Sequence, residues 1–179
     1  MANQDAAFGL RANSKLGSNV NSEGTTEYSI ASGASGNIFS GDPVKMANTG
    51  TILVAAAGDQ LLGVFRGCRY TNASGEVIYS AYWPDGTVSS DAVAFVVDDP
   101  NALFEVQSAA TGSVVQTVVG NNADIVYASG STSDGQSAVT ISGTPAATTA
   151  QLRIIGISND PENNTLGTGS QSANVNMIV

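Results

Sequence analysis

Short apolar runs separated by turn residues dominate the chain beyond its first 27 residues. Residues 76–83 (EVIYSAYW) and 172–179 (SANVNMIV) alternate between apolar and polar positions, and this period of two is typical of a strand that buries one face. Residues 92–97 (AVAFVV) form an apolar run too short for a typical helix. The Pro-Asp-Gly sequence at 84–86 is one of several turn signals between the runs. The pattern predicts a mostly β domain, a small barrel or sandwich of short strands with few or no helices.

Two segments carry more detailed expectations. Residues 113–120 (SVVQTVVG) fit a helix that starts at a capping serine, ends at a glycine and places four valines on one face. The same valines favour a strand because their branched Cβ atoms restrict the side-chain rotamers, so both readings stay open. In the last segment the alternation predicts four inward side chains: Ala173, Val175, Met177 and Val179.

The first 27 residues have a different character. They are polar and glycine-dotted, with isolated apolar residues such as Phe8 and Leu10 and no sustained period. We therefore expect residues 1–27 to form an extended N-terminal arm and residues 28–179 to form a single β-rich domain. A chain of 179 residues with 42% hydrophobic residues has the size and composition to bury one core.

The net charge of −9 is distributed unevenly along the chain. Residues 1–69 carry five acidic and five basic residues, whereas residues 70–179 carry ten acidic residues and one basic residue, Arg153. Because nucleic-acid affinity comes largely from Lys and Arg displacing counterions, we expect no direct binding to DNA or RNA. The chain has no apolar stretch near the roughly 20 residues of a membrane span, and no apolar segment of a signal peptide near its start, so we expect neither.

Few residues are suited to catalysis or cofactor binding. The chain contains no histidine, the commonest general base and transition-metal ligand. Residues 58–63 (GDQLLG) have the glycine spacing of a phosphate-binding loop, but Val64 and Phe65 stand where Lys and Ser or Thr would be needed. The single cysteine, Cys68, lies in an apolar run without a base, which favours a buried structural thiol. We expect no enzyme activity, no metal and no cofactor.

Three carboxylates form the remaining candidate for chemistry. Asp98, Asp99 and Glu105 could act as a carboxylate pair of a hydrolase or bind calcium, since both need clustered oxygens. The Asp-Pro-Asn sequence at 99–101 is also ordinary turn chemistry, and we favour that interpretation.

An aromatic cluster is the last candidate, formed by Tyr70, Tyr79, Tyr82 and Trp83. Aromatic side chains on strands usually belong to the core, but they can also stack on sugars or contact a protein.

Seven short segments together resemble a known family. They are, in order, MANQDAAFGLR, NIFSGDPVKM, AAAGDQLLGVFRGCRY, YWPDG, DDPNALFEVQ, NNADIVY and QLRIIGISNDPENN. The ordered set resembles small structural proteins of tailed bacteriophages that are identified as capsid decoration, or cement, proteins, and it extends over residues 2–164. The family commonly has a proline after the FGLR motif, where this chain has Ala12 and Asn13.

The resemblance implies a virion protein without catalytic residues, made in the host cytoplasm and placed on the outer surface of the phage head. It further implies binding to the major capsid protein and a homotrimer at three-fold positions. It also implies a β-tulip-like barrel, in which Gly41-Asp42 and Gly58-Asp59 turn the chain at the ends of adjacent strands.

The contact with the shell is expected first in the arm, at Phe8, Leu10 and Arg11. An extended segment can add to the edge of a neighbour's sheet, with the two apolar side chains as anchors and the arginine paired with a carboxylate. Tyr82 and Trp83 are the next candidates for this contact. Two other functions stay open: a tail or fibre module that binds host glycans through Tyr82 and Trp83, and a carboxylate-dependent hydrolase.

Overall fold

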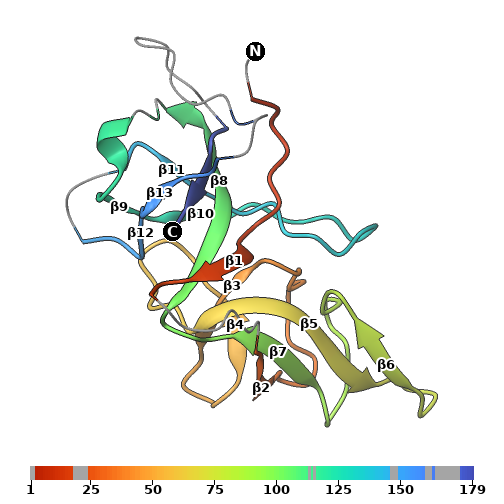
Figure 1. Ribbon diagram of the computed structural model, residues 1–179. Helices are drawn as coiled ribbons and strands as arrows, with labels where there is room; N and C mark the ends of the chain where they lie inside the picture. Colours follow the sequence, from red (N-terminus) through yellow and green to blue (C-terminus); the bar gives the residue numbers. More distant parts are fainter. Residues whose placement is uncertain are drawn as a thin grey trace.

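The computed structural model describes residues 3–17, 24–112, 114, 116–145, 149–159, 163 and 174–179. These residues form fourteen strands and one short 3-10 helix, and no α-helix occurs among them. The mostly β class predicted from the sequence is therefore confirmed. The strands build two six-stranded sheets and one two-stranded ribbon, and no closed barrel is formed by the described residues (Figure 1).

The first sheet is named the β5 sheet after its central strand. Its strand order is β2-β7-β5-β3-β4. Two strands pair with different ends of β5: β3 pairs with its first residues, and β6 pairs with its last residues. All its pairings are antiparallel. Its strands are β2 (Thr26–Ser29), β3 (Pro43–Met46), β4 (Ile52–Val54), β5 (Gly63–Thr71), β6 (Val77–Ser80) and β7 (Val93–Val97).

The second sheet is named the β8 sheet and has the order β10-β11-β8-β14-β13, with β1 also paired to β8. Only the β8–β11 pairing is parallel. Its strands are β1 (Arg11–Lys15), β8 (Ala102–Gly112), β10 (Ile125–Val126), β11 (Thr140–Gly143), β13 (Gly156–Ile157) and β14 (Asn176–Ile178). The ribbon pairs β9 (Asn122–Ala123) with β12 (Leu152–Arg153), and the 3-10 helix is η1 (Gln116–Val118).

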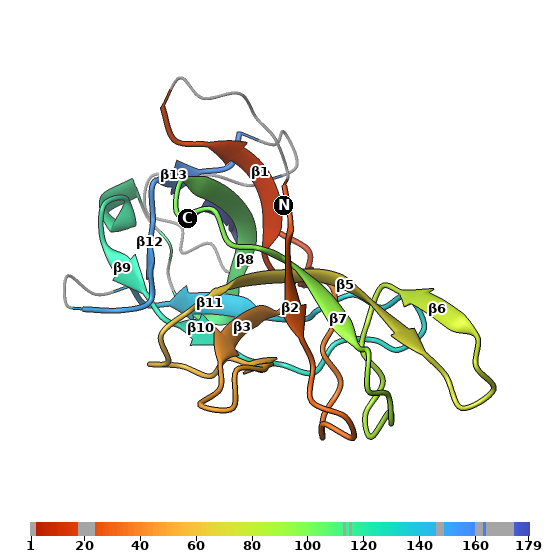
Figure 2. The same ribbon diagram turned by 90° about the horizontal axis from the view of Figure 1, so that it is seen from below.

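Each sheet has its own group of buried side chains. The β5 core includes Phe65, Trp83 and Val96, and the β8 core includes Leu10, Val106 and Met177. Val64 and Ala55 come from the β5-sheet segments but belong to the β8 core, so the second core reaches one end of the first sheet. Figure 1 shows β1 and the start of β8 over that end of the β5 sheet, whereas β6 projects from the other end (Figures 1 and 2).

The N-terminal segment is part of the folded body, which corrects the prediction of a separate arm over residues 1–27. Residues Arg11–Lys15 form β1 and pair antiparallel with β8, and Thr26–Ser29 form β2 and pair with β7. Residues 18–23 lie outside the described part of the chain. The polar sequence suggested an extended arm because its partner strands, β8 and β7, come much later in the chain: Arg11 is opposite Glu105, and Glu27 is opposite Phe95.

The C-terminal alternation is confirmed where the structure describes it. Val175, Met177 and Val179 are buried, whereas the predicted inward Ala173 lies outside the described residues. Over residues 113–120 the chain forms the 3-10 turn η1 with Val118 buried, while Ser113 and Val115 are not described. Among the described residues of this segment, the 3-10 turn takes the place of the predicted helix or strand.

The two Gly-Asp turns are where the sequence placed them. Gly41 and Gly58 have positive φ angles of 97° and 83°, a conformation that glycine adopts without steric cost. Gly41-Asp42 precedes β3, Gly58-Asp59 follows β4, and these two strands pair with each other. The prediction that both turns lie at the ends of adjacent strands is confirmed.

Candidate partner-binding site

Leu10 is a core residue and not an anchor for another protein. It is 1% exposed and packs in the β8 core, and its backbone N–H donates to the carbonyl oxygen of Gly41 at 2.9 Å. The two backbones come this close because Gly9, which precedes Leu10, lies against Gly41 and neither has a side chain. A Cβ on Gly9 would lie 2.6 Å from the Gly41 oxygen, closer than real Cβ atoms approach. The expected role of Leu10 in shell contact is therefore wrong.

Arg11 finds its carboxylate within the same chain. Its guanidinium forms an ion pair with Glu105 on β8, which is 6% exposed and also accepts a hydrogen bond from the Ser158 hydroxyl at 2.6 Å. The Arg11 Cζ lies 4.8 Å from the centre of the Phe8 ring, which is half-buried. Gln107 on the same strand holds the chain further upstream, because its side-chain amide bonds both Gln4 O and Ala6 N at 3.1 Å.

These contacts explain why β8 carries polar residues in an otherwise buried strand. Glu105 and Gln107 are buried, but each is satisfied by the N-terminal segment that lies over it. Phe8, Leu10 and Arg11 are thus brought together beside β8, where Leu10 is buried, Phe8 is half-buried and the Arg11 side chain stays 59% exposed. The sequence holds one signal for this docking, the two polar residues spaced by two in LFEVQ.

The two aromatic candidates separate in the structure. Trp83 is fully buried in the β5 core, with Tyr70 packed edge-on at 5.3 Å between ring centres, so it cannot form an exposed stacking platform or a surface contact. Tyr82 is half-buried and stacks on the buried Phe39 at 5.6 Å. The prediction that Trp83 contacts a partner is wrong, because its large apolar surface is more stable in the core.

The three carboxylates hold different structural partners. Asp98 accepts hydrogen bonds from the hydroxyls of Thr26 at 2.9 Å and Tyr28 at 2.7 Å, which ties β2 to the end of β7. Asp99 forms an ion pair with Lys15 on β1, and this interaction lowers the pKa of Asp99. Glu105 is held by Arg11. No group of three or more metal-ligating side chains occurs among the residues that the structure describes.

Cys68 and the 58–63 loop have structural positions. Cys68 is 1% exposed in the β5 core, and burial raises the pKa of its thiol to about 12. Asp59 in the loop accepts an ion-pair hydrogen bond from Lys45 Nζ at 2.7 Å and a second from the Ala56 N–H at 2.7 Å. The Lys45 bond, more than the other interactions, lowers the pKa of Asp59.

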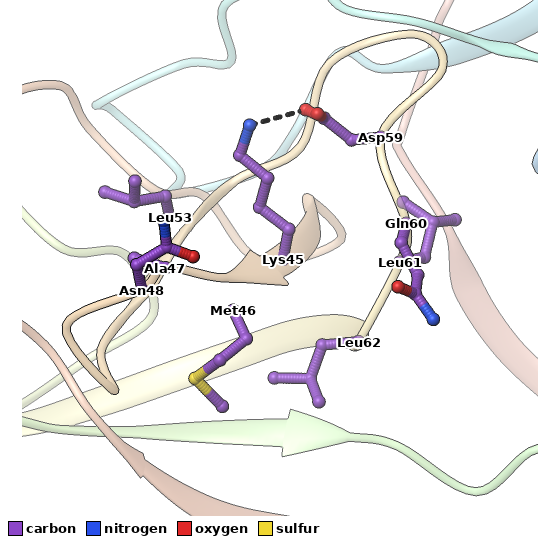
Figure 3. Close-up of a pocket in the computed structure, with 9 residues that line it drawn as sticks. All are labelled: Lys45, Met46, Ala47, Asn48, Leu53, Asp59, Gln60, Leu61 and Leu62. Atoms are coloured by element: carbon purple, nitrogen blue, oxygen red, sulfur yellow. Dashed lines mark hydrogen bonds and ion pairs between the residues drawn. The ribbon is translucent and has the colours of Figure 1, made fainter.

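Lys45 and Asp59 line an open hollow beside the β3–β4 hairpin, and Figure 3 shows Lys45 directed at Asp59 across it. Met46 and Leu53 line it as well and are 43% and 39% exposed. Its charged pair is bonded within the chain, and Asn48 and Gln60 share the lining with the apolar residues, so the hollow offers a partner both polar and apolar contacts.

The strongest candidate for partner binding is the outer face of the β5 sheet, meaning the face turned away from the β5 core. Residues directly opposite in neighbouring strands share a face. Cys68 and Ala94 are opposite each other and buried in the β5 core, so the next pair along, Arg69 and Val93, points outward. Tyr79 on β6 is opposite Arg69 and joins the outer face.

One half of this outer face is covered and the other half is open. At the covered half, Val64 and Val97 are opposite each other and 3% and 4% exposed, beneath the β8 core. At the open half, Val77 and Tyr79 on β6 are 52% and 72% exposed. The other outward positions of this half, partly exposed or exposed, are Glu27, Ser29, Arg66, Arg69, Thr71, Val93 and Phe95.

Arg69 has a special position on the open half. It stands between Tyr79 and Val93, and its guanidinium forms no ion pair or side-chain hydrogen bond with any residue that the structure describes. Lys15, Lys45 and Arg11 are all paired with carboxylates. The loop around Gly135 reaches Ala81 and Tyr82 at the border of this face but leaves Tyr79 exposed.

The alternation of residues 76–83 predicts a strand with one buried face, and aromatic residues on strands usually belong to the core. The sequence holds no signal for which face of β6 is covered, since alternation defines two faces without saying which is inside.

Comparisons of the chain with protein-family models, with curated proteins and with solved structures find no match. Within the described part of the chain, no helix has the length and apolar character needed to cross a membrane.

Proposed function

We propose that this chain is a decoration protein of a tailed-bacteriophage head, which binds the outer face of the capsid and stabilises contacts between major capsid protein subunits. The proposal rests on the resemblance of the seven ordered segments. The structural observation that supports it is the open half of the β5 sheet, where the exposed Val77 and Tyr79 lie on the same face as Arg69. Exposed apolar patches rimmed by polar residues are typical of protein contacts.

The connection between the two sheets suits this task. The N-terminal segment is fastened to β8 by Leu10, Arg11 and the Gln107 amide, so the two sheets are joined by more than the turn between β7 and β8. A body fastened in this way can transmit load between two neighbouring subunits of a shell. In a trimer, each bound copy would hold the other two near their sites, and avidity could exceed a single affinity by roughly 10²–10⁴.

The test is to purify particles, locate the chain by image reconstruction and count its copies. A head decoration protein is expected as density outside the shell at hundreds of copies. Density in the tail at a few to dozens of copies would favour the tail or fibre function instead. Addition of the purified chain to heads that lack it should restore the density, and a failure to bind such heads would reject the proposal.

A further inference from the structure

Residues 127–136, between β10 and β11, form a strap along the turn at residues 39–42. Figures 1 and 2 show this segment as a long narrow loop that reaches from β10 toward β6. Two backbone hydrogen bonds hold it to the turn: the Ser40 N–H donates to the Gly135 oxygen at 2.9 Å, and the Ser137 N–H donates to the Ser40 oxygen at 3.0 Å. All residues of the strap except Gly130 and Gly135 are exposed. A segment with so few buried contacts opens more readily than the core beneath it.

The closed strap covers part of a stacked aromatic pair. A Cβ on Gly130 would lie 2.7 Å from the Phe39 ring. A Cβ on Gly135 would lie 3.4 Å from the Tyr82 ring. Phe39 is 0% exposed and stacks on Tyr82 at 5.6 Å between ring centres. Release of the strap therefore changes the surroundings of both rings.

The same turn holds a buried carboxylate. Asp42 is 0% exposed, its Oδ2 accepts a hydrogen bond from the Phe39 N–H at 2.8 Å, and its Oδ1 is buried without a hydrogen-bond partner among the described residues. Burial raises the pKa of Asp42 to about 6. The Ser137 side chain, at the end of the strap, and the Phe39 N–H lower it. A buried carboxylate with an unpaired oxygen costs more free energy than the neutral acid.

No cation offsets a negative charge on Asp42 within the described part of the chain. None of the charged side chains on the segments that meet at the turn shifts its pKa: Arg11, Lys45, Arg66 and Asp134. Tyr127, in the strap, is the titratable group that faces Asp42. Burial, and after it the negative charge of Asp42, raises the pKa of Tyr127. Ionised Asp42 is thus a buried charge that only water could stabilise further.

We propose that the strap is a proton-controlled latch: it lies closed over the turn at residues 39–42 while Asp42 is neutral, and ionisation of Asp42 favours its release. The latch is a property of the folded chain and does not depend on the proposed function. Its direction follows from burial, because release lets water reach the carboxylate. The closed state therefore holds the Asp42 proton more tightly than the released state does, and a rise in pH favours release.

Hydrogen exchange of single backbone amides, followed by NMR on the full chain between pH 4 and pH 8, tests the latch. The reporting amides are Ser40 and Ser137, and the reference amides are Phe104 and Ser108, which donate from β8 to the C-terminal segment. After correction for intrinsic exchange, the opening constant at Ser40 and Ser137 is expected to exceed that of the reference amides. It should rise roughly fiftyfold over this pH range, because the pKa of Asp42 falls from about 6 toward 3.8 on release.

A matched pair of variants assigns the rise to one carboxylate. Asp42→Asn keeps an acceptor for the Phe39 N–H and cannot ionise, so the opening constant at the reporting amides should stay level with pH. Asp134→Asn removes an exposed carboxylate of the strap, keeps an acceptor for the Gln136 N–H and should retain the full rise. Melting curves check that both variants fold.

Three outcomes would overturn the latch. Equal opening constants at the reporting and reference amides would mean that the strap is released only by global unfolding. An opening constant at Ser40 and Ser137 that does not change with pH would mean that release leaves Asp42 buried. A rise that persists in Asp42→Asn would assign the titration to another group. The first two outcomes are read from the unmodified chain, so the test holds even if Asp42→Asn does not fold.

Discussion

The two halves of the outer face of the β5 sheet have the same strand pattern and opposite surroundings. At one half Val64 and Val97 are buried beneath the β8 core, and at the other half Val77 and Tyr79 are exposed to solvent. The strands β5 and β7 run through both halves without interruption apart from a bulge near Arg66. The comparison shows that what differs is the cover, which is supplied by Leu10, β1 and β8 from elsewhere in the chain.

The largest effect on the free energy of unfolding is expected for Leu10, which lies over the covered half of the β5 sheet. Leu10→Ala should lower the free energy of unfolding by about 2–5 kcal/mol, because it removes a fully buried side chain and leaves a cavity. Denaturant unfolding followed by circular dichroism measures this. The matched control is Leu16→Ala in the same segment, where the side chain is 54% exposed and the change should stay within about 0.5 kcal/mol. Equal effects of the two changes would mean that the N-terminal segment does not cover the sheet.

A second test uses pH at the covered half, where Asp42 is fully buried next to the contact of Gly41 with Leu10. Burial raises the pKa of Asp42 to about 6, although the Ser137 side chain and the Phe39 N–H, which donates to Oδ2 at 2.8 Å, lower it. Because the folded state holds the Asp42 proton more tightly than the unfolded state does, the protonated carboxyl adds to the free energy of unfolding. This contribution is complete below the ordinary pKa near 3.8 and is lost as the pH rises through about 6.

Asp42→Asn keeps an acceptor for Phe39 and removes this titration. Between pH 4 and pH 8 the free energy of unfolding of the variant should therefore rise relative to the unmodified chain by about 3 kcal/mol, since one pKa unit corresponds to about 1.36 kcal/mol. Chemical denaturation of both proteins at several pH values gives the difference. The lowered pKa values of Asp59 and Asp99 affect both proteins equally and cancel. A pH-independent difference would show that Asp42 titrates normally.

A matched pair of valine substitutions compares the two halves directly. Val64→Thr should lower the free energy of unfolding by about 1–3 kcal/mol, because it buries a hydroxyl in an apolar site. Val77→Thr makes the same change on the open half, opposite Thr71, and should be neutral within about 0.5 kcal/mol. Thermal melting of both variants measures the difference in stability between them. A comparable loss for Val77→Thr would indicate that some part of the molecule also covers β6.

The smallest effect on folding is expected for Tyr79→Ser, within about 0.5 kcal/mol, because Tyr79 is largely exposed. Tyr70→Ser, on the opposite face of the same hairpin, should cost about 1 kcal/mol or more through lost packing on Trp83. Denaturant unfolding of both variants gives the contrast. Destabilisation by Tyr79→Ser equal to that of Tyr70→Ser would contradict the assignment of the two faces.

The sequence by itself determined the local structure. The alternation in EVIYSAYW and SANVNMIV predicted strands that the structure contains, and the Gly-Asp pairs predicted the turns beside β3 and β4. These features depend on backbone conformation and side-chain period, which a few neighbouring residues set. The mostly β class followed from the same signals.

Tertiary structure decided which faces are covered and which residues are free to meet a partner. Leu10 was expected to contact the shell and Trp83 was a further candidate for that contact, but both are buried, whereas Arg69 and Tyr79 are on the open face. Arg11 was expected to find a carboxylate on another protein and finds Glu105, 94 residues away in its own chain. A period of two marks two faces of a strand equally, and only packing between segments far apart in sequence buries one and exposes the other.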